Sequence, residues 1–441
     1  MTNARYNYDV VVIGAGPAGL HAAAVALRHG VRVALIDDNP RPGGQIWRQG
    51  PAFDAAKPLK SWLDEHAQRG DLTLIGGARV VAVTGDRRFL IERELDAPPI
   101  QVQYERLILA TGAREKLLPF DGWTLPGVTG AGGLQALIKG GIDVRGERIV
   151  VAGSGPLLLA SAATAVERGA NVVGVIEQAP LARVLRFGAS LVATPHKLMQ
   201  AAKLMRTLTF ARYRVDAVVS AAQGSAQVES VTVRARGREQ QILCDRLAIG
   251  YGLVPNVTLA QALGCKVDAQ RGIAVDDLQR TSVAAVFAAG ECTGIGGMEL
   301  ASAEGALAAY AALDIDDAGV SAERHARTRW RRFAARLDAA FELGDAARAL
   351  ASKDTILCRC EDVTVGAVAI HANWRDAKLH TRCGIGACQG RVCGAAAATL
   401  FDWDVPPPRP PFSPARIETL MATGDDGETL QRHFDESEAP L

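Results

Sequence analysis

The hydrophobic positions of the first forty residues follow a strand–helix–strand pattern. Tyr8–Ile13 is a short apolar, β-branched run typical of a buried parallel strand. A glycine turn follows, then an alanine-rich stretch to about His29 and a second apolar run at Val31–Ile36. This order predicts a βαβ unit whose second strand stops at the acidic residue Asp37.

The turn between this strand and helix has the spacing Gly-X-Gly-X-X-Gly. Its first glycine allows a tight turn, its second lets the backbone approach a pyrophosphate, and its third permits close helix–strand packing. The helix N-terminus would face the phosphates, and Asp37, about 20 residues farther on, would bind ribose hydroxyls. The alternative is a glycine-rich turn without a ligand, but three glycines at the correct spacing are harder to explain in that way. The candidate contacts in the turn are Gly14, Gly16, Pro17, Ala18 and Gly19.

A second copy of the pattern begins at residue 148. The strand 148–152 leads into Gly153 and Gly155, then a helix to about residue 168 and a strand that ends at Glu177. Leu158 stands where the third glycine would pack the helix on the strand, so this site differs from the first. It either takes another nucleotide, NAD(P) or ATP, or has lost its ligand.

Two further apolar runs predict strand ends at a ligand crevice, because open α/β sheets bind ligands beyond the carboxyl ends of their strands. The first, 106–112, ends in Ala110, Thr111 and Gly112. The second, Thr281–Glu291, is predicted as a strand closed by Gly290 and Glu291.

Composition narrows the class of protein. The 441 residues suffice for two to four domains, and 48% hydrophobic residues exclude global disorder. Lysine plus arginine (49) balances aspartate plus glutamate (48), so no net field attracts nucleic acid. We find no signal peptide and no apolar run long enough to span a membrane, and therefore expect a cytoplasmic protein. Any membrane association would come through a complex.

Five of the eight cysteines lie between residues 358 and 393. In a chain that is not secreted, such thiols more often bind metals or catalyse than form disulfides. Four thiolates from two short loops suit a [2Fe–2S] cluster. Zinc is the rival, but structural zinc usually takes CxxC pairs, and Cys358 and Cys360 form a CxC. Spacing alone does not choose the other two ligands, because Cys383, Cys388 and Cys393 are evenly spaced.

Residues 8–315 resemble the pyridine nucleotide–disulfide oxidoreductases, flavoproteins with two dinucleotide-binding domains. The resemblance implies that the first glycine turn and Asp37 hold FAD, that residues 110–112 touch it, and that the loop with Gly44 and Gln45 lies against the flavin. Gly290-Glu291 replaces the family's Gly-Asp, which lengthens the carboxylate that would bind the ribityl chain. No redox cysteine pair precedes residue 358, so we assign no catalytic residue.

The C-terminal cysteines resemble the bacterioferritin-associated-ferredoxin-type [2Fe–2S] domain, in which the position of Cys383 is often not cysteine. This resemblance implies that the ligands are Cys358, Cys360, Cys388 and Cys393. A helix starting just after Cys393 would help to hold the negative cluster, and glycines 384, 386 and 390 would turn backbone N–H groups toward the sulfurs.

The whole order of motifs resembles the FAD subunits of hydrogen cyanide synthase, of octopine and nopaline oxidases, and of D-hydroxyproline and proline dehydrogenases. It implies a hetero-oligomer in which a D-amino-acid-oxidase-like subunit oxidises the amine, with a small ferredoxin-like [2Fe–2S] subunit. This chain would relay electrons. Two alternatives stay open: a self-sufficient NAD(P)H-dependent reductase, and a scaffold that keeps a nucleotide for structure.

We therefore predict an α/β fold with two Rossmann-like dinucleotide-binding domains and a small C-terminal helical [2Fe–2S] domain. The expected boundaries are 1–120 with 245–320 for the FAD domain, 121–244 for the second nucleotide domain, 321–352 for a helical connector, 353–405 for the [2Fe–2S] domain and 406–441 for a proline-rich tail.

Overall fold

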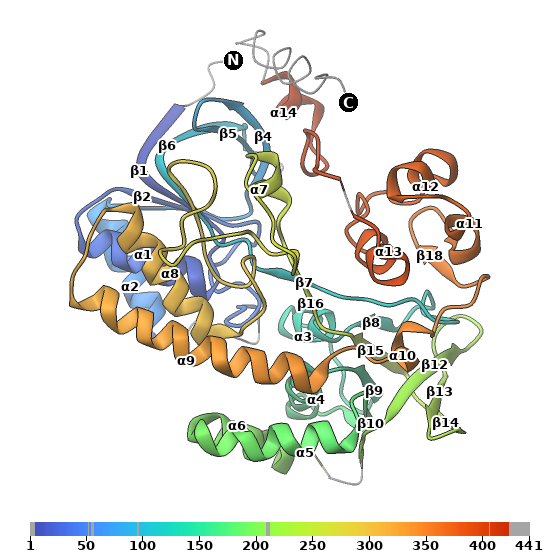
Figure 1. Ribbon diagram of the computed structural model, residues 1–441. Helices are drawn as coiled ribbons and strands as arrows, with labels where there is room; N and C mark the ends of the chain where they lie inside the picture. The colour runs from blue at the N-terminus through green and yellow to red at the C-terminus, as the bar shows by residue number, and fades with distance from the viewer. Residues whose placement is uncertain are drawn as a thin grey trace.

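One mostly parallel and one fully parallel sheet with covering helices, followed by a small helical module, confirm the predicted α/β class (Figure 1). The computed structural model describes residues 5–51, 53, 57–94, 97–208, 212–404 and 406–422. The last part of the predicted tail, 423–441, lies outside the described residues.

The first sheet contains the predicted N-terminal βαβ unit. Its strand order is β3-β2-β1-β6-β5-β4, and β17 pairs with β6. β1, β2, β3, β6 and β17 run parallel, whereas β4 and β5 form an antiparallel hairpin. The strands are β1 (Arg5–Ile13), β2 (Val33–Ile36), β3 (Leu72–Ile75), β4 (Arg79–Gly85), β5 (Arg88–Glu92), β6 (Ile100–Leu109) and β17 (Val286–Ala288).

Two helices, α1 (Pro17–Arg28) and α8 (Met298–Ala312), pack together on one face of this sheet (Figure 1). Both are rich in alanine and bury most of their residues, so their backbones approach closely. A Cβ on Gly305 of α8 would lie 2.0 Å from the Ala18 carbonyl oxygen of α1. Apolar side chains of α7 (Thr258–Ala262) pack on the opposite face, and α2 (Lys57–Arg69) lies beside β3.

The second sheet has the order β11-β10-β9-β15-β8, all parallel. Its strands and helices are β8 (Val128–Gly130), α3 (Ala131–Lys139), β9 (Arg148–Gly153), α4 (Leu157–Glu167), β10 (Asn171–Glu177), α5 (Leu181–Ser190), the short 3₁₀ helix η1 (Leu191–Ala193), α6 (Pro195–Thr207), β11 (Tyr213–Arg214) and β15 (Arg246–Gly250). An antiparallel meander, β12 (Ala217–Gln223), β13 (Ser230–Ala235) and β14 (Arg238–Leu243), stands beside it.

The chain crosses between the two units through a short antiparallel pair, β7 (Ala113–Glu115) and β16 (Leu253–Pro255). Since β15 pairs with β8 and β9, the chain leaves the second sheet only after Gly250. The boundary predicted from the sequence for this crossing is residue 244.

The predicted strand Thr281–Glu291 is much shorter in the structure, where only β17 pairs with β6. The Thr281 amide and hydroxyl both donate hydrogen bonds to the Val286 carbonyl, at 3.0 and 2.9 Å. These bonds fold residues 281–286 into a closed turn, with Ala285 at a φ of +62°. The apolar run therefore contains a turn that its hydrophobicity does not reveal.

A long helix, α9 (Ala318–Phe341), runs along both units, beside α8 and α5 (Figure 1). After α10 (Asp345–Arg348) follow β18 (Ile356–Cys358), β19 (Val363–Thr364), α11 (Val365–Ala369), α12 (Trp374–Thr381) and α13 (Cys393–Phe401). They share a small apolar core. No helix among the described residues has the length and hydrophobicity needed to cross a membrane.

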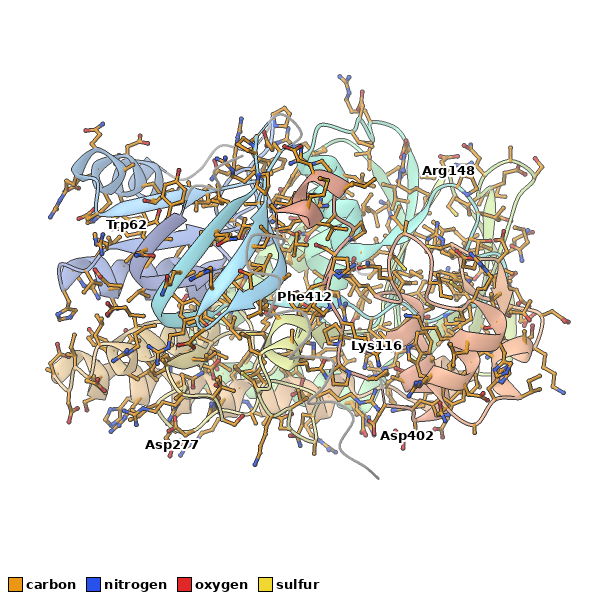
Figure 2. All side chains as sticks on the ribbon, turned by 90° about the horizontal axis from the view of Figure 1, so that it is seen from above. Trp62, Lys116, Arg148, Asp277, Asp402 and Phe412 are labelled. Atoms are coloured by element: carbon orange, nitrogen blue, oxygen red, sulfur yellow. The ribbon has the colours of Figure 1, made fainter. Side chains whose placement is uncertain are left out.

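The described part of the proline-rich tail returns to the first sheet. The Phe412 amide bonds the Val81 carbonyl at 2.9 Å, and the buried ring lies in the core beside β4 and β5 (Figure 2). The Arg416 amide donates to the Glu92 carboxylate at 2.7 Å, just before α14 (Ile417–Met421). Residues 406–422 of the tail thus pack against the chain's own first sheet.

A substitution at the α1–α8 contact tests how closely the two helices pack. Gly305→Ala should lower the free energy of unfolding by about 1–3 kcal/mol, because the added methyl overlaps backbone atoms of α1. Gly188→Ala in α5 is the matched control, since its Cβ would meet nothing within 4 Å and alanine favours helix. Chemical denaturation of both variants measures the difference. Equal stabilities would contradict the close contact.

Candidate nucleotide and cysteine sites

The first glycine turn is a point of close backbone contact. Gly14 has a φ of +108°, and a Cβ there would lie 2.1 Å from the Ala110 carbonyl oxygen at the end of β6. A Cβ on Gly19 would lie 1.8 Å from the Gly14 carbonyl oxygen. A Cβ on Gly16 would meet the Gly44 Cα at 3.9 Å, an ordinary van der Waals distance, so packing does not require this glycine. It lies at the N-terminus of α1, whose first residue is Pro17, where backbone amides favour a phosphate.

Asp37 holds the turn and the end of β2 together. Its Oδ2 accepts from the Ala15 amide at 2.5 Å, and its Oδ1 accepts from the Asn39 amide and side chain, both at 2.7 Å. A carboxylate has about four acceptor positions, so one stays available to a ribose hydroxyl. The side chain is mostly buried, as a residue under a bound nucleotide would be.

The loop with Gly44 and Gln45 lies on this turn. The Gly43 amide bonds the Ala15 carbonyl at 2.7 Å, and a Cβ on Gly44 would lie 2.8 Å from the Gly16 Cα. Gln45 Oε1 accepts from Arg48 Nε at 3.2 Å.

Gly290 and Glu291 follow β17 beside the same turn, where a Cβ on Gly290 would lie 2.8 Å from Ala18 Cβ. Burial raises the pKa of Glu291. Sequence reasoning missed the buried Glu304 of α8, which accepts from the Gly290 amide and the Thr293 hydroxyl at 3.1 Å each and pairs with Arg331 at 3.1 Å. The sequence does contain a signal for it, because Glu304 is a carboxylate among alanines in the middle of the helix, whereas Glu299 lies in the first turn.

Thr111 and Gly112 leave β6 toward the second unit. The Thr111 hydroxyl donates to the Asn256 carbonyl at 2.7 Å, and the Asn256 amide bonds the Gly112 carbonyl at 2.9 Å. Cys292, which is fully buried nearby, donates to the Leu109 and Ala289 carbonyls, and burial raises its pKa to about 11. These contacts support a packing role for this thiol.

The second glycine turn has the same backbone plan but a different environment. Gly153 packs on β15, where its Cβ would lie 1.9 Å from the Gly250 carbonyl oxygen, and Leu158 is fully buried. Glu177 occupies the place of Asp37 and is only 1% exposed. Its two oxygens accept from the Gly155 and Ala179 amides at 2.7 and 2.8 Å, and burial raises its pKa to about 7.

The end of α9 closes this second turn. The Ser154 hydroxyl donates to the Phe341 carbonyl at 2.9 Å, and a Cβ on Gly155 would lie 3.8 Å from the Phe341 ring. Gln178 donates to the Glu342 carbonyl at 3.0 Å and accepts from the Gly344 amide at 3.0 Å. The chain's own backbone therefore covers the place where phosphates would approach.

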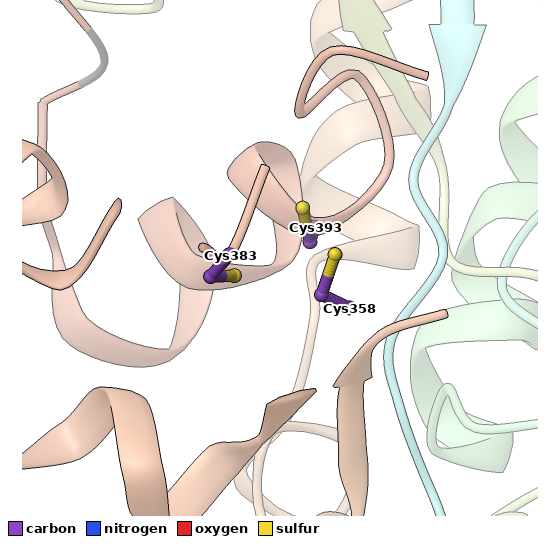
Figure 3. A group of neighbouring side chains, drawn as sticks. All are labelled: Cys358, Cys383 and Cys393. Atoms are coloured by element: carbon purple, nitrogen blue, oxygen red, sulfur yellow. The ribbon is translucent and has the colours of Figure 1, made fainter. Parts of the chain in front are cut away.

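The five clustered cysteines converge in the C-terminal module. The sulfurs of Cys358, Cys383 and Cys393 all lie within 4.8 Å of one another (Figure 3). Hydrogen bonds from the thiols of Cys393 and Cys360 lower the pKa of Cys388, against the effect of burial. Such a set of convergent thiols fits a metal cluster. The structure thus brings in Cys383, which the sequence left out.

Glycines shape the loop around these thiols. A Cβ on Gly386 would lie 2.3 Å from Cys360 Cβ, and Gly384 and Gly390 have positive φ angles beside Trp374. The Gly390 amide bonds the Cys388 sulfur, as predicted for one of the three glycines. Cys360 is exposed, so the set of five cysteines extends to the protein surface. The predicted helix is α13, and Cys393 is its first residue.

β7 connects the first site to the cysteine module. It starts one residue after Gly112, and its three residues span about 10 Å. Arg114 is close enough to Cys388 and Arg391 for their charges to act on its guanidinium, whose pKa burial lowers. Glu115 accepts from the Gly132 and Gly133 amides, at 2.6 and 2.9 Å, at the N-terminus of α3. The short crossing strand therefore touches all three units.

Comparisons with known proteins agree with this architecture. Residues 8–308 match the pyridine nucleotide-disulphide oxidoreductase family. The chain is 33% identical to an opine oxidase subunit of Agrobacterium tumefaciens (strain Ach5), over 89% of this chain and 85% of that one. It is 32% identical to the HcnB subunit of hydrogen cyanide synthase from Pseudomonas aeruginosa, over 88% and 91% of the two chains.

Among solved structures, L-proline dehydrogenase from P. horikoshii superposes with a TM-score of 0.63 at 19% identity, covering 95% of this chain and 80% of that one. Thioredoxin reductase from T. acidophilum superposes with a TM-score of 0.55 at 25% identity, covering 70% and 98%. The first likeness extends beyond the two nucleotide units.

The burial of Glu177 predicts that the stability of the folded protein depends on pH. Folding raises the pKa of Glu177 from 4.5 to about 7. The protonated carboxyl group therefore stabilises the folded state relative to the carboxylate, and this stabilisation is lost as the pH rises through about 7. Glutamine resembles the protonated acid in shape. The stability of the native protein relative to Glu177→Gln should therefore fall by about 3 kcal/mol between pH 4.5 and 7.5.

Chemical denaturation at several pH values measures this difference. Glu239→Gln, at an exposed position of β14, is the control and should show a constant difference from the native protein. A constant difference for Glu177→Gln as well would contradict the burial of that carboxyl group.

Proposed function

The chain belongs to the pyridine nucleotide-disulphide oxidoreductase family of FAD-dependent oxidoreductases, and from that premise we propose that it is the FAD and [2Fe–2S] electron-transfer subunit of a hetero-oligomeric amino- or imino-acid dehydrogenase. Its relatives of similar length are named as subunits of opine oxidase and hydrogen cyanide synthase. One partner in the proposal is a D-amino-acid-oxidase-like catalytic subunit. The other is a small ferredoxin-like [2Fe–2S] subunit, and the complex would work in the cytoplasm.

The observation that carries the proposal is the set of convergent cysteines that follows the two nucleotide units in the same chain. The second glycine turn supports it, because Ser154 and Gln178 bond the backbone at the end of α9 and so close that turn. A reductase that uses NAD(P)H needs the second turn open. With that turn closed, electrons enter from a partner that has oxidised the amine substrate.

The first turn supplies the contacts for FAD. Gly14 and Gly19 bring the strand ends together, and the amides at the start of α1 face the pyrophosphate. Asp37 keeps one acceptor position for the ribose, and Glu291 is the carboxylate for the ribityl chain. Bound FAD takes electrons in pairs, and a [2Fe–2S] cluster accepts them one at a time.

For the cluster we propose Cys358, Cys360, Cys388 and Cys393 as ligands. Cys360 and Cys388 share a hydrogen bond in the surface loop, and Cys358 and Cys393 lie beneath them. The buried Cys383 is a neighbour of this set and packs in the core of the module. The exposure of Cys360 supports docking of a partner at this place, since single electrons must leave through the protein surface.

Two matched serine variants test the ligand set. Cys388→Ser should abolish the electron paramagnetic resonance signal of the reduced cluster and lower bound iron, because a thiolate ligand is lost. Cys383→Ser should keep both. The opposite pattern would show that Cys383 is a ligand and Cys388 is not, and full signals in both variants would overturn the set.

Anaerobic addition of NADH to the purified chain tests the route of electron entry. The flavin absorbance should persist, because Phe341 and Gln178 close the second turn, and dithionite should bleach it as a positive control. Rapid bleaching by NADH would favour the self-sufficient reductase. A chain that purifies with an adenine nucleotide and no flavin would favour the scaffold.

A further inference from the structure

A basic pocket lies between α9 and η1, on a part of the molecule that the proposed function does not use. It has a volume of about 590 Å³, within the range of small-molecule sites. Four arginines of α9 line it together with Phe333 and residues at the end of η1, and no acidic residue contributes to its wall. The four are Arg324, Arg329, Arg332 and Arg336.

The charges of these four side chains are not neutralised by protein groups. None of them forms an ion pair with any carboxylate among the described residues. The two other arginines of α9 behave differently, because Arg327 pairs with Asp277 and Arg331 with Glu304. Segments packed against α9 therefore supply carboxylates to Arg327 and Arg331, whereas no acidic residue lines the pocket.

The spacing of the arginines makes this arrangement unfavourable without an anion. Arg332 and Arg336 are four residues apart on the helix, and Arg329 and Arg332 are three apart, so like charges face each other. Such pairs destabilise a helix. From Arg324 to Arg336 the row spans about 18 Å, enough for several guanidinium groups to bind one extended ligand.

Aromatic and polar neighbours fix the guanidinium groups in place. Arg329 lies 4.8 Å above the Trp330 ring and Arg336 lies 5.8 Å above the Phe333 ring. Arg336 Nη2 donates to the hydroxyl of the buried Thr194 at 3.3 Å, while its buried Nε has no hydrogen-bond partner among the described residues.

We propose that this pocket binds a nucleoside diphosphate or triphosphate. Planar guanidinium groups bind phosphate oxygens in pairs, and several of them match a chain of phosphates better than one phosphate. Phe333 and Ala193 supply the apolar wall for the ring system. The site differs from both glycine turns, because its donors are side chains of one helix rather than amides at a helix N-terminus.

Isothermal titration of the full-length, FAD-loaded chain tests the proposal with four probes: ATP, ADP, inorganic pyrophosphate and adenosine. We expect ATP and ADP to bind, pyrophosphate to bind more weakly, and adenosine to give no heat. Raising the salt concentration should weaken ATP binding, as expected for partly exposed charges. Equal affinities for pyrophosphate and ATP, or no binding of ATP, would overturn the assignment.

Variants locate the binding. Arg332→Ala and Arg336→Ala should each weaken ATP binding roughly tenfold, and Arg332→Lys should weaken it less because the charge remains. Arg375→Ala, at an exposed arginine of α12, is the control and should leave affinity unchanged. Unchanged affinity in the two α9 alanine variants, with their thermal unfolding intact, would place ATP elsewhere and overturn the proposal.

Discussion

The close backbone contact at the first glycine turn is the constraint on which the rest of the structure depends. Gly14 and Gly19 allow β1, β6 and α1 to meet without side chains between them, and Gly305 lets α8 join at Ala18. A single methyl at any of these glycines would overlap main-chain atoms that have no room to move. The proposed FAD site lies around this contact, with Asp37, residues 110–112 and Gly290 beside it. The site therefore depends on the close approach of these backbones.

Local patterns predicted the βαβ units well, because buried strands and glycine turns are each formed by consecutive residues. β1, β2, β9 and β10 begin and end within about three residues of the predicted positions. The differences concern hydrogen bonds and packing that the pattern of apolar residues does not reveal. The turn at 281–286 depends on hydrogen bonds of Thr281, and the role of Glu304 depends on α8 lying beside β17.

The two glycine turns show why a shared motif does not imply a shared ligand. Asp37 and Glu177 follow equivalent strands, and each accepts a hydrogen bond from an amide of its own glycine turn. The difference comes from α9, more than 160 residues later in the chain, whose last residue bonds Ser154 and lies against Gly155. The same helix carries the arginine pocket. It thus closes one potential nucleotide site with its end and forms another kind of anion site along its side.

We propose that one chain combines a flavin site with a [2Fe–2S] site, joined by the short crossing strand β7. The content of flavin, iron, acid-labile sulfide and zinc in the purified chain tests this combination. We expect about two iron atoms and about two sulfides for each FAD, with no zinc. A purified chain that holds FAD at full occupancy together with zinc in place of iron would show that the cysteines do not bind a [2Fe–2S] cluster.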